Sequence, residues 1–216
     1  MKPYFERDGC TIYHGDCRDI LPGLDAAALI TDPPYGIAYR SGHAGALPRS
    51  IEGDDDTELR DFAILSWLPR PAAAFATWRC VPPEPPRGCL VWVKNAGGMG
   101  DLGFPWQPNF EMVWIYGKGW TGHRGSAVLT GRTVCTWNTG PAARLHPHEK
   151  PVDVFGKIIG KAPPGTILDP FMGSGTTLVA ARDLGRKAMG IEIEEKYCEI
   201  AAKRLAQGVL PFGDAK

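Results

Sequence analysis

The chain has 216 residues, 44% of them hydrophobic, which is enough to bury a sizeable core in one domain or in one domain with an insertion. Basic and acidic residues number 24 each, so the formal charge is zero and a polyanionic partner must be held by local positive charge. We see no signal peptide and no membrane-spanning apolar run, so a cytoplasmic protein is expected.

Strands and helices are predicted to alternate along the chain. Apolar runs predict strands at residues 11–13, 27–31, 89–93, 111–116, 166–168 and 187–191, with an edge strand at 133–137. Helical spacing predicts helices at 59–67, 152–162, 177–184 and 194–207, with a helical turn at 17–21. This alternation is typical of an α/β fold with a mainly parallel sheet.

A glycine- and serine-rich loop is expected at residues 36–53. The acidic residues that follow it, at 54–56, favour the start of a helix through capping and the helix dipole rather than a metal site. The histidines show no ligand spacing beyond His146 and His148, so no metal is implied. Six cysteines without Cys-x-x-Cys spacing are typical of a reduced protein with buried thiols.

Two predicted strands end in tight turns that carry polar residues. The first is followed by Asp32-Pro33-Pro34-Tyr35, and the second by residues 169–177, which read Asp-Pro-Phe-Met-Gly-Ser-Gly-Thr-Thr. Open α/β sheets bind their ligands at the carboxyl ends of the strands. Two such turns therefore predict two adjacent pockets at that edge, although a plain Pro-Pro turn remains the alternative for the first.

The glycine turn does not match the common phosphate-binding patterns. A dinucleotide fingerprint requires a third glycine where Leu178 stands, and a phosphate-binding loop requires a lysine where Thr176 stands. Gly173 and Gly175 permit close approach of a ligand to the backbone, unless they only make a tight turn. Glu192 ends the next predicted strand, where an acid accepts hydrogen bonds from ribose hydroxyls.

A long stretch between Glu111 and Glu149 contains no acidic residue. Its basic side chains are Lys118, His123, Arg124, Arg132, Arg144, His146 and His148. Such a segment can contact phosphates without making the whole protein basic. The alternative is a solvated loop that lacks acids by chance.

Four blocks in a defined order carry a family resemblance. Besides the two turns, they are His146-Pro147-His148-Glu149-Lys150-Pro151 and Gly190-Ile191-Glu192-Ile193, with a weaker match at His14-Gly15-Asp16-Cys17. The chain resembles, over roughly residues 10 to 205, the permuted β-group of DNA amino-methyltransferases, which methylate adenine N6 or cytosine N4. The resemblance implies a Rossmann-like methyltransferase fold, with a mostly parallel seven-stranded sheet, one antiparallel strand and helices on both faces.

The resemblance implies S-adenosylmethionine as cofactor. Asp169 would face its methionyl amino group, Lys150 its carboxylate with His146 nearby, and Asp16 its adenine edge. The implied cofactor-binding set is Asp16, Asp32, His146, Lys150, Asp169, Phe171, Gly173, Ser174, Gly175, Thr176 and Glu192. In the third block, His148 and Glu149 replace the frequent Thr and Gln of the family, which leaves the contacts of that turn open.

Asp32, Pro33, Pro34 and Tyr35 are the implied catalytic residues. The exocyclic amine of a base is a poor nucleophile because its lone pair is delocalised into the ring. The Asp32 side chain and the Pro33 carbonyl would accept hydrogen bonds from it, and Tyr35 would stack on the flipped base. Asp rather than Ser at position 32 favours adenine N6 in this family, with cytosine N4 as the alternative.

Double-stranded DNA is the implied partner. Phosphate contacts are predicted for basic residues after the first turn and in the acid-free stretch, namely Arg40, His43, Arg49, Lys118, His123, Arg124 and Arg132. The DNA-recognition region is expected at residues 36–53 and about 95–145 of a single catalytic domain, 1–216. A region this small implies a short target sequence or a second subunit in a homodimer.

Two rival functions remain open. The same fold methylates RNA or small molecules in other proteins, and a catalytically silent nucleic-acid-binding relative is a rival from another class. The basic segment favours a nucleic acid, and the two intact turns argue against a silent relative. A compact enzyme of this kind suits a bacterium or a phage, with or without a restriction partner.

Overall fold

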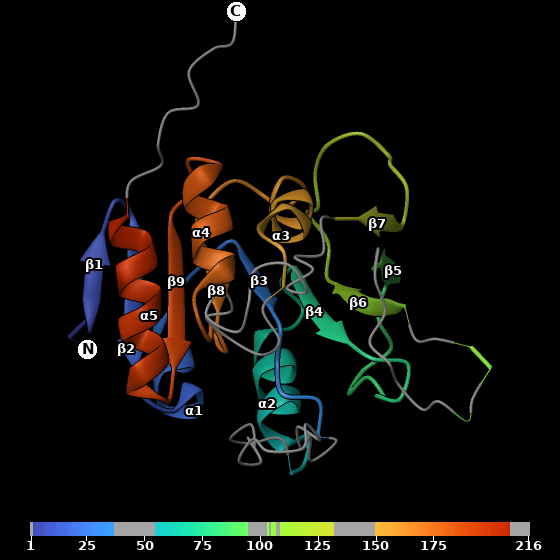
Figure 1. Ribbon diagram of the computed structural model, residues 1–216, viewed down its shortest axis with the longest axis horizontal. Helices are drawn as coiled ribbons and strands as arrows, with labels where there is room; N and C mark the ends of the chain where they lie inside the picture. Colours follow the sequence, from blue (N-terminus) through green and yellow to red (C-terminus); the bar gives the residue numbers. More distant parts are fainter. Residues whose placement is uncertain are drawn as a thin grey trace, which may run out of the picture.

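The computed structural model describes residues 2–36, 55–94, 103, 105–106, 109–131 and 150–207. Figure 1 shows these residues as one sheet with helices on both of its faces. The predicted edge strand at 133–137 lies outside the described residues, as does the predicted loop at 36–53 apart from Gly36.

The sheet has nine strands among the described residues, in the order β1-β2-β9-β8-β3-β4-β6-β5-β7. In chain order the strands are β1 (Phe5–Arg7), β2 (Cys10–His14), β3 (Ala28–Thr31), β4 (Ala72–Ala76), β5 (Gly88–Val93), β6 (Phe110–Tyr116), β7 (Val128–Thr130), β8 (Ile167–Asp169) and β9 (Ala188–Glu192). Every strand predicted within the described residues is present, with ends that differ by one or two residues.

The structure differs from the expected sheet of seven strands with one antiparallel strand, both in the number of strands and in their directions. β1 pairs antiparallel with β2, and β6 pairs antiparallel with both β4 and β5, while all other described pairs are parallel. The additional antiparallel strand, β1, arises from a tight hairpin. Its turn residues, Asp8 and Gly9, have φ of +50° and +76°, as a two-residue Asp-Gly turn requires.

Sequence patterning missed β1, β4 and β7. The first and last are three-residue strands at the two edges of the sheet, too short to show a period. β4 reads Ala-Ala-Ala-Phe-Ala, and alanine is the best helix former and is depleted in strands. Its position between β3 and β6 buries every residue of the strand, so tertiary packing overrides the local preference.

The helices form two layers that cover opposite faces of the sheet. They are α1 (Cys17–Ile20), the 3-10 turn η1 (Leu21–Gly23), α2 (Glu58–Trp67), α3 (Val152–Ile159), α4 (Thr176–Asp183) and α5 (Glu195–Ala206). One core cluster joins the sheet to α3, α4 and α5, and the other joins it to α1 and α2. No helix within the described residues is long and apolar enough to cross a bilayer.

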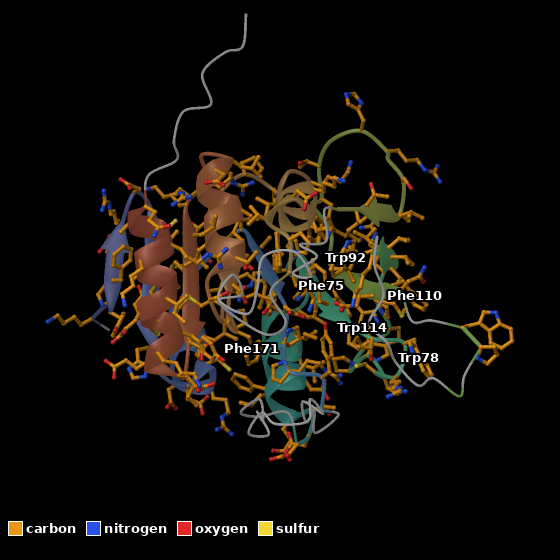
Figure 2. The ribbon with its side chains drawn as sticks, in the orientation of Figure 1. Phe75, Trp78, Trp92, Phe110, Trp114 and Phe171 are labelled. Carbon is orange, nitrogen blue, oxygen red and sulfur yellow. The ribbon has the colours of Figure 1, made fainter. Side chains whose placement is uncertain are left out.

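Aromatic side chains fill both cores. Trp92 and Trp114 are buried on strands, and Phe75 packs edge-on against Trp92 (Figure 2). The acidic run before α2 acts at the helix start, since the Asp56 carboxylate accepts a hydrogen bond from the Glu58 amide at 2.8 Å. This placement agrees with the capping interpretation of that run.

Candidate active site

One edge of the sheet gathers the predicted acidic residues. The neighbouring strands β2, β9, β8 and β3 are parallel, so their carboxyl ends meet at this edge. Asp169 ends β8, and Asp32 follows β3. Glu192 ends β9, and Asp16 follows β2. The strand order therefore places these four side chains in a row, with the glycine turn after β8 between Glu192 and Asp32.

Asp169 ties the two turns together from inside the protein. Its side chain is 2% exposed, and its carboxylate accepts hydrogen bonds from the Thr31 hydroxyl at 2.6 Å and the Thr177 hydroxyl at 2.5 Å. The Phe171 amide donates a third, at 3.0 Å. Burial raises the pKa of Asp169 to about 6, although the three hydrogen bonds oppose this shift. The carboxylate thus links β3, β8 and the start of α4.

The two glycines of the turn serve different purposes. Gly175 has φ of +83° and begins α4, and a side chain there would lie 2.8 Å from the Ala201 methyl group. Gly173 also has positive φ, +50°, but a Cβ atom at this position would meet nothing within 4 Å. Glycine is therefore needed at position 175 because α5 packs closely against it. At Gly173 the absence of a side chain leaves open space beside the backbone, as an approaching ligand requires.

Glu192 supports the glycine turn from the neighbouring strand. Its Oε2 atom accepts a hydrogen bond from the Gly173 amide at 3.0 Å, and Oε1 accepts one from the Glu194 amide at 2.8 Å. Burial raises the pKa of Glu192 to about 7, and the hydrogen bonds only partly offset this effect. Each carboxylate oxygen keeps a further lone pair, so the side chain retains acceptor capacity for a ligand hydroxyl.

Other predicted cofactor residues make structural contacts. Asp16 caps α1 by accepting a hydrogen bond from the Arg18 amide at 2.8 Å, and the Arg18 guanidinium pairs with the same carboxylate. That pairing lowers the pKa of Asp16. The Ser174 and Thr176 hydroxyls are buried and accept hydrogen bonds from Arg204 of α5 at 3.1 and 3.3 Å.

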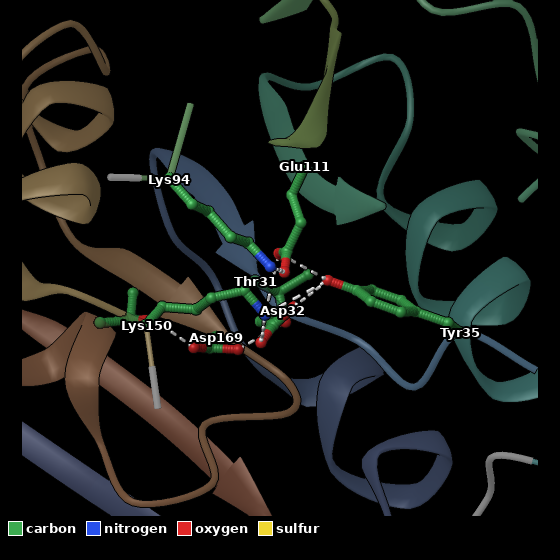
Figure 3. Close-up of polar contacts among 8 residues, drawn as sticks. Thr31, Asp32, Tyr35, Lys94, Glu111, Lys150 and Asp169 are labelled. Carbon is green, nitrogen blue, oxygen red and sulfur yellow. Dashed lines mark hydrogen bonds and ion pairs between the residues drawn. The ribbon is translucent and has the colours of Figure 1, made fainter. Parts of the chain in front are cut away.

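The first turn carries a polar network around Asp32 (Figure 3). Asp32 Oδ1 accepts a hydrogen bond from the Tyr35 hydroxyl at 2.7 Å, and Oδ2 pairs with Lys150 Nζ at 2.6 Å. Lys150 is 8% exposed, and its Nζ also lies 3.3 Å from the Tyr35 hydroxyl. The two sequence blocks that contain Asp32 and Lys150, predicted to share a site, therefore meet directly.

Glu111 and Lys94 complete this network, and sequence reasoning missed both. Glu111 Oε2 lies 3.2 Å from Lys150 Nζ, and Oε1 lies 2.5 Å from Lys94 Nζ (Figure 3). Lys94 follows β5, so it reaches the same edge as Asp32. Glu111 stands near the start of β6, which reaches this edge because β6 runs antiparallel. The available signal was an acid directly before the apolar run at 112–115.

Mutual pairing keeps Lys150 and Glu111 charged despite their burial. Burial opposes the charged forms, but Asp32 and Glu111 together hold the pKa of Lys150 above its ordinary value. Burial likewise opposes ionisation of Glu111, and Lys150 with Lys94 holds the pKa of its carboxyl below the usual range. Burial and the adjacent carboxylates raise the pKa of Tyr35 well above its ordinary value, so its hydroxyl stays a donor.

The described basic residues of the acid-free stretch lie away from this network. Tyr116, at the end of β6, pairs with Ala72 at the start of β4, so Lys118 follows at the amino edge of the parallel strands. The Lys161 ammonium, between α3 and β8, donates to the His123 carbonyl at 2.5 Å, and the Thr121 amide donates to the Lys161 carbonyl at 2.8 Å, so this loop lies at the same edge. The phosphate contacts predicted for Lys118, His123 and Arg124 stay a prediction, at an edge of the sheet opposite the Asp32 turn.

Several predicted residues lie outside the described part of the chain. They are Arg40, His43, Arg49, Arg132 and His146. Within the described ranges, no three histidine, cysteine or acidic side chains form a group able to hold a metal ion.

Comparisons with known proteins agree on one family. Residues 90–203 match the N6/N4 methyltransferase family, described as DNA methylase. The chain is 31% identical over 212 residues to Escherichia coli K12 YubD, with 89% of this chain and 88% of that protein covered. It is 27% identical over 273 residues to the type II methyltransferase M.ScaI of Streptomyces caespitosus, covering 94% of this chain and 84% of the relative.

Solved structures show the same fold. The complex of M1.HpyAVI with SAM superposes with a TM-score of 0.61 at 24% identity, covering 90% of this chain and 99% of that one. The cytosine-N4-specific PvuII DNA methyltransferase superposes with a TM-score of 0.62 at 14% identity, covering 96% of both chains. At these identities, the likeness concerns the fold alone.

Proposed function

The chain belongs to the N6/N4 family of DNA methylases, whose methyl donor is S-adenosylmethionine, and we therefore propose that it methylates the N6 amine of an adenine flipped out of duplex DNA. The observation that carries the proposal is the adjacency of the two turns. β3 and β8 are neighbouring parallel strands, so the Asp32 turn lies beside the glycine turn that follows Asp169.

The glycine turn and its surroundings fit the cofactor. Gly173 offers a backbone with open space beside it, and Glu192 has acceptor capacity next to the same turn. S-adenosylmethionine has no phosphate, and the turn lacks the lysine that a phosphate-binding loop uses. When bound, it supplies an electrophilic methyl group on sulfur, and the pair of electrons in the broken bond stays on that sulfur.

Asp32 prepares the base amine for reaction. Its carboxylate and the Pro33 carbonyl accept hydrogen bonds from the amine, which favour a tetrahedral nitrogen with its lone pair directed toward the donor side. The nitrogen becomes positively charged once it forms the new bond to carbon. Asp32 then takes the proton that the nitrogen releases, so the carboxylate acts late and does not need to be a strong base beforehand.

Tyr35 holds Asp32 in position and borders the base site. Its hydroxyl donates to Asp32 Oδ1 at 2.7 Å, and its ring lies 5.5 Å from Lys150 Nζ. A fixed carboxylate orients the amine at little entropic cost during reaction. We propose that the aromatic face also stacks on the flipped base, which offsets part of the few kcal/mol that leaving the duplex costs.

DNA recognition is proposed for the segments around the Asp32 turn. The single catalytic domain 1–216 keeps residues 36–53 as its first candidate region, because they follow Tyr35 directly. Within about 95–145, however, β6 and β7 belong to the sheet and the 117–125 loop lies at the amino edge. The remaining parts of that range stay candidates for reading the target sequence.

Methyl transfer to defined duplex DNA tests the proposal. Labelled S-adenosylmethionine and unmethylated duplex are incubated with the protein, and the nucleosides are analysed by mass spectrometry. N6-methyladenine supports the proposal. N4-methylcytosine would retain the amine chemistry but refute the choice of adenine. Label on RNA alone, or on neither nucleic acid, would refute the proposed reaction.

A further inference from the structure

Glu111 occupies a place in the network that the reaction described above does not use. Its side chain is part-buried at the start of β6 and bridges two ammonium groups, Lys150 at 3.2 Å and Lys94 at 2.5 Å. Its Oε2 atom also lies 3.4 Å from the Tyr35 hydroxyl. The turn after β3, the residue after β5 and the segment before α3 therefore place polar side chains on this one carboxylate.

Lys150 creates a difficulty for Asp32. A lysine 2.6 Å from a single part-buried carboxylate forms a close ion pair, and that carboxylate then stabilises a second positive charge less well. Methyl transfer places such a second charge on the base nitrogen beside Asp32. An unshared Lys150 ammonium would also repel the developing cation.

Glu111 supplies the missing negative charge. The network contains two carboxylates, Asp32 and Glu111, and two ammonium groups, Lys94 and Lys150, so its formal charges cancel. Because Lys150 lies within ion-pair distance of both carboxylates, its attraction is divided between them. Lys94 in turn anchors the far oxygen of Glu111 and keeps it directed at Lys150.

We propose that Glu111 is a positioning residue for methyl transfer, which shares the Lys150 ammonium with Asp32 and so leaves Asp32 able to accept and stabilise the base amine. This inference rests on the proposed function, because it assigns Asp32 to the amine. It differs from a direct catalytic role, since Glu111 acts only through Lys150.

A double-mutant cycle tests this dependence. Glu111→Gln keeps the side-chain shape but removes the charge, and we expect its single-turnover rate at saturating cofactor and DNA to fall roughly tenfold to a hundredfold. Lys150→Met removes the cation that Glu111 controls, so in that background the same Glu111→Gln change should alter the rate less than about twofold. Glu6→Gln, an exposed acid on β1 at the far end of the sheet, is the matched control.

A second readout does not depend on activity. Carbon-13 NMR of labelled lysines in the ligand-free protein follows the ionisation of Lys150, whose signal is assigned by its loss in Lys150→Met. Without Glu111, burial is opposed by one carboxylate instead of two, so the pKa of Lys150 should fall in Glu111→Gln and stay unchanged in Glu6→Gln. If Glu111→Gln does not fold, Lys94→Met, which leaves Glu111 charged but without its anchor, should give a smaller loss of rate that again disappears in the Lys150→Met background.

The outcomes separate this inference from the proposed function. An active wild type whose Glu111→Gln rate is unchanged would overturn the role of Glu111 alone. Equal losses in the wild-type and Lys150→Met backgrounds would do the same, because they would show that Glu111 does not act through the lysine. A wild type that methylates no DNA would overturn both.

Discussion

At the scale of single residues, burial sets the chemistry of the acids at the sheet edge. Asp169 and Glu192 have raised pKa values, about 6 and about 7, because burial penalises their charged forms. Glu111 is also buried, but two lysines hold its pKa below the usual range. Neighbouring carboxylates thus differ in their pKa because Glu111 pairs closely with two ammonium groups, whereas burial dominates at Asp169 and Glu192.

Cofactor binding is predicted to depend on pH through Glu192. Ribose hydroxyls are best bound by the ionised carboxylate, whereas about half of the ligand-free protein is protonated there near pH 7. Below pH 7 a proton must leave on binding, so the Kd for S-adenosylmethionine should rise as the pH falls, by at most about tenfold per unit. Calorimetry at pH 6, 7 and 8 measures this dependence.

Glu192→Gln is the control for that titration. Its amide does not ionise between pH 6 and 8, so the Kd of the variant should change much less over the range. An equally steep pH dependence in the variant would mean that another group titrates on binding, and would remove Glu192 from the proposed cofactor contacts.

At the scale of elements, the Asp169 carboxylate connects the two functional turns. It accepts hydrogen bonds from Thr31 on β3 and from Thr177 on α4, so the strand before the Asp32 turn and the helix after the glycine turn are fixed to each other. The sequence predicted that the turns would be neighbours. It did not predict this link, because the resemblance assigned Asp169 to the cofactor and sequence spacing carries no information on which hydroxyls meet it.

The two glycines of the turn should respond differently to alanine. Gly173→Ala introduces only the strain of positive φ, about 1–2 kcal/mol, since its Cβ meets no atom within 4 Å. Gly175→Ala adds a contact of 2.8 Å with Ala201, so its loss in unfolding free energy should be larger by roughly 1–3 kcal/mol. Urea unfolding of both variants gives the comparison.

Cofactor affinity gives a second way to distinguish Gly173→Ala from Gly175→Ala. Gly173→Ala fills the open space beside the turn, so the Kd for S-adenosylmethionine should rise even though the variant is folded. Unchanged affinity in this variant would show that the open space at Gly173 is not the cofactor's place.

At the scale of the whole molecule, strand direction decides which residues reach the site. In parallel strands the last residues meet the ligand edge, and the sequence identified Asp32, Asp169 and Glu192 on that basis. β6 runs the other way, so its first residues reach the edge instead, which is why Glu111 was missed, and Lys118 follows its last residue at the opposite edge. Local patterning finds a strand but does not give its direction, because direction depends on pairing with distant segments.

Basic residues at the amino edge are therefore predicted to be dispensable for methylation. A Lys118→Ala, Arg124→Ala double variant should keep the KM for duplex DNA within about twofold of the wild type, as surface substitutions far from a site usually do. Steady-state kinetics at two salt concentrations measure this KM in the variant and in the wild type. A clearly reduced salt dependence of KM would show that the DNA contacts this edge after all.

Methyl transfer is assigned to the Asp32 turn, and Asp32→Ala tests that assignment most directly. In single-turnover assays with labelled S-adenosylmethionine and duplex DNA, the rate of N6-methyladenine formation should fall by at least about a hundredfold, as loss of a group that stabilises charge developing in the transition state does. The Kd for the cofactor should change far less, because the glycine turn is intact. A variant that still methylates DNA at a rate near that of the wild type would contradict the assignment.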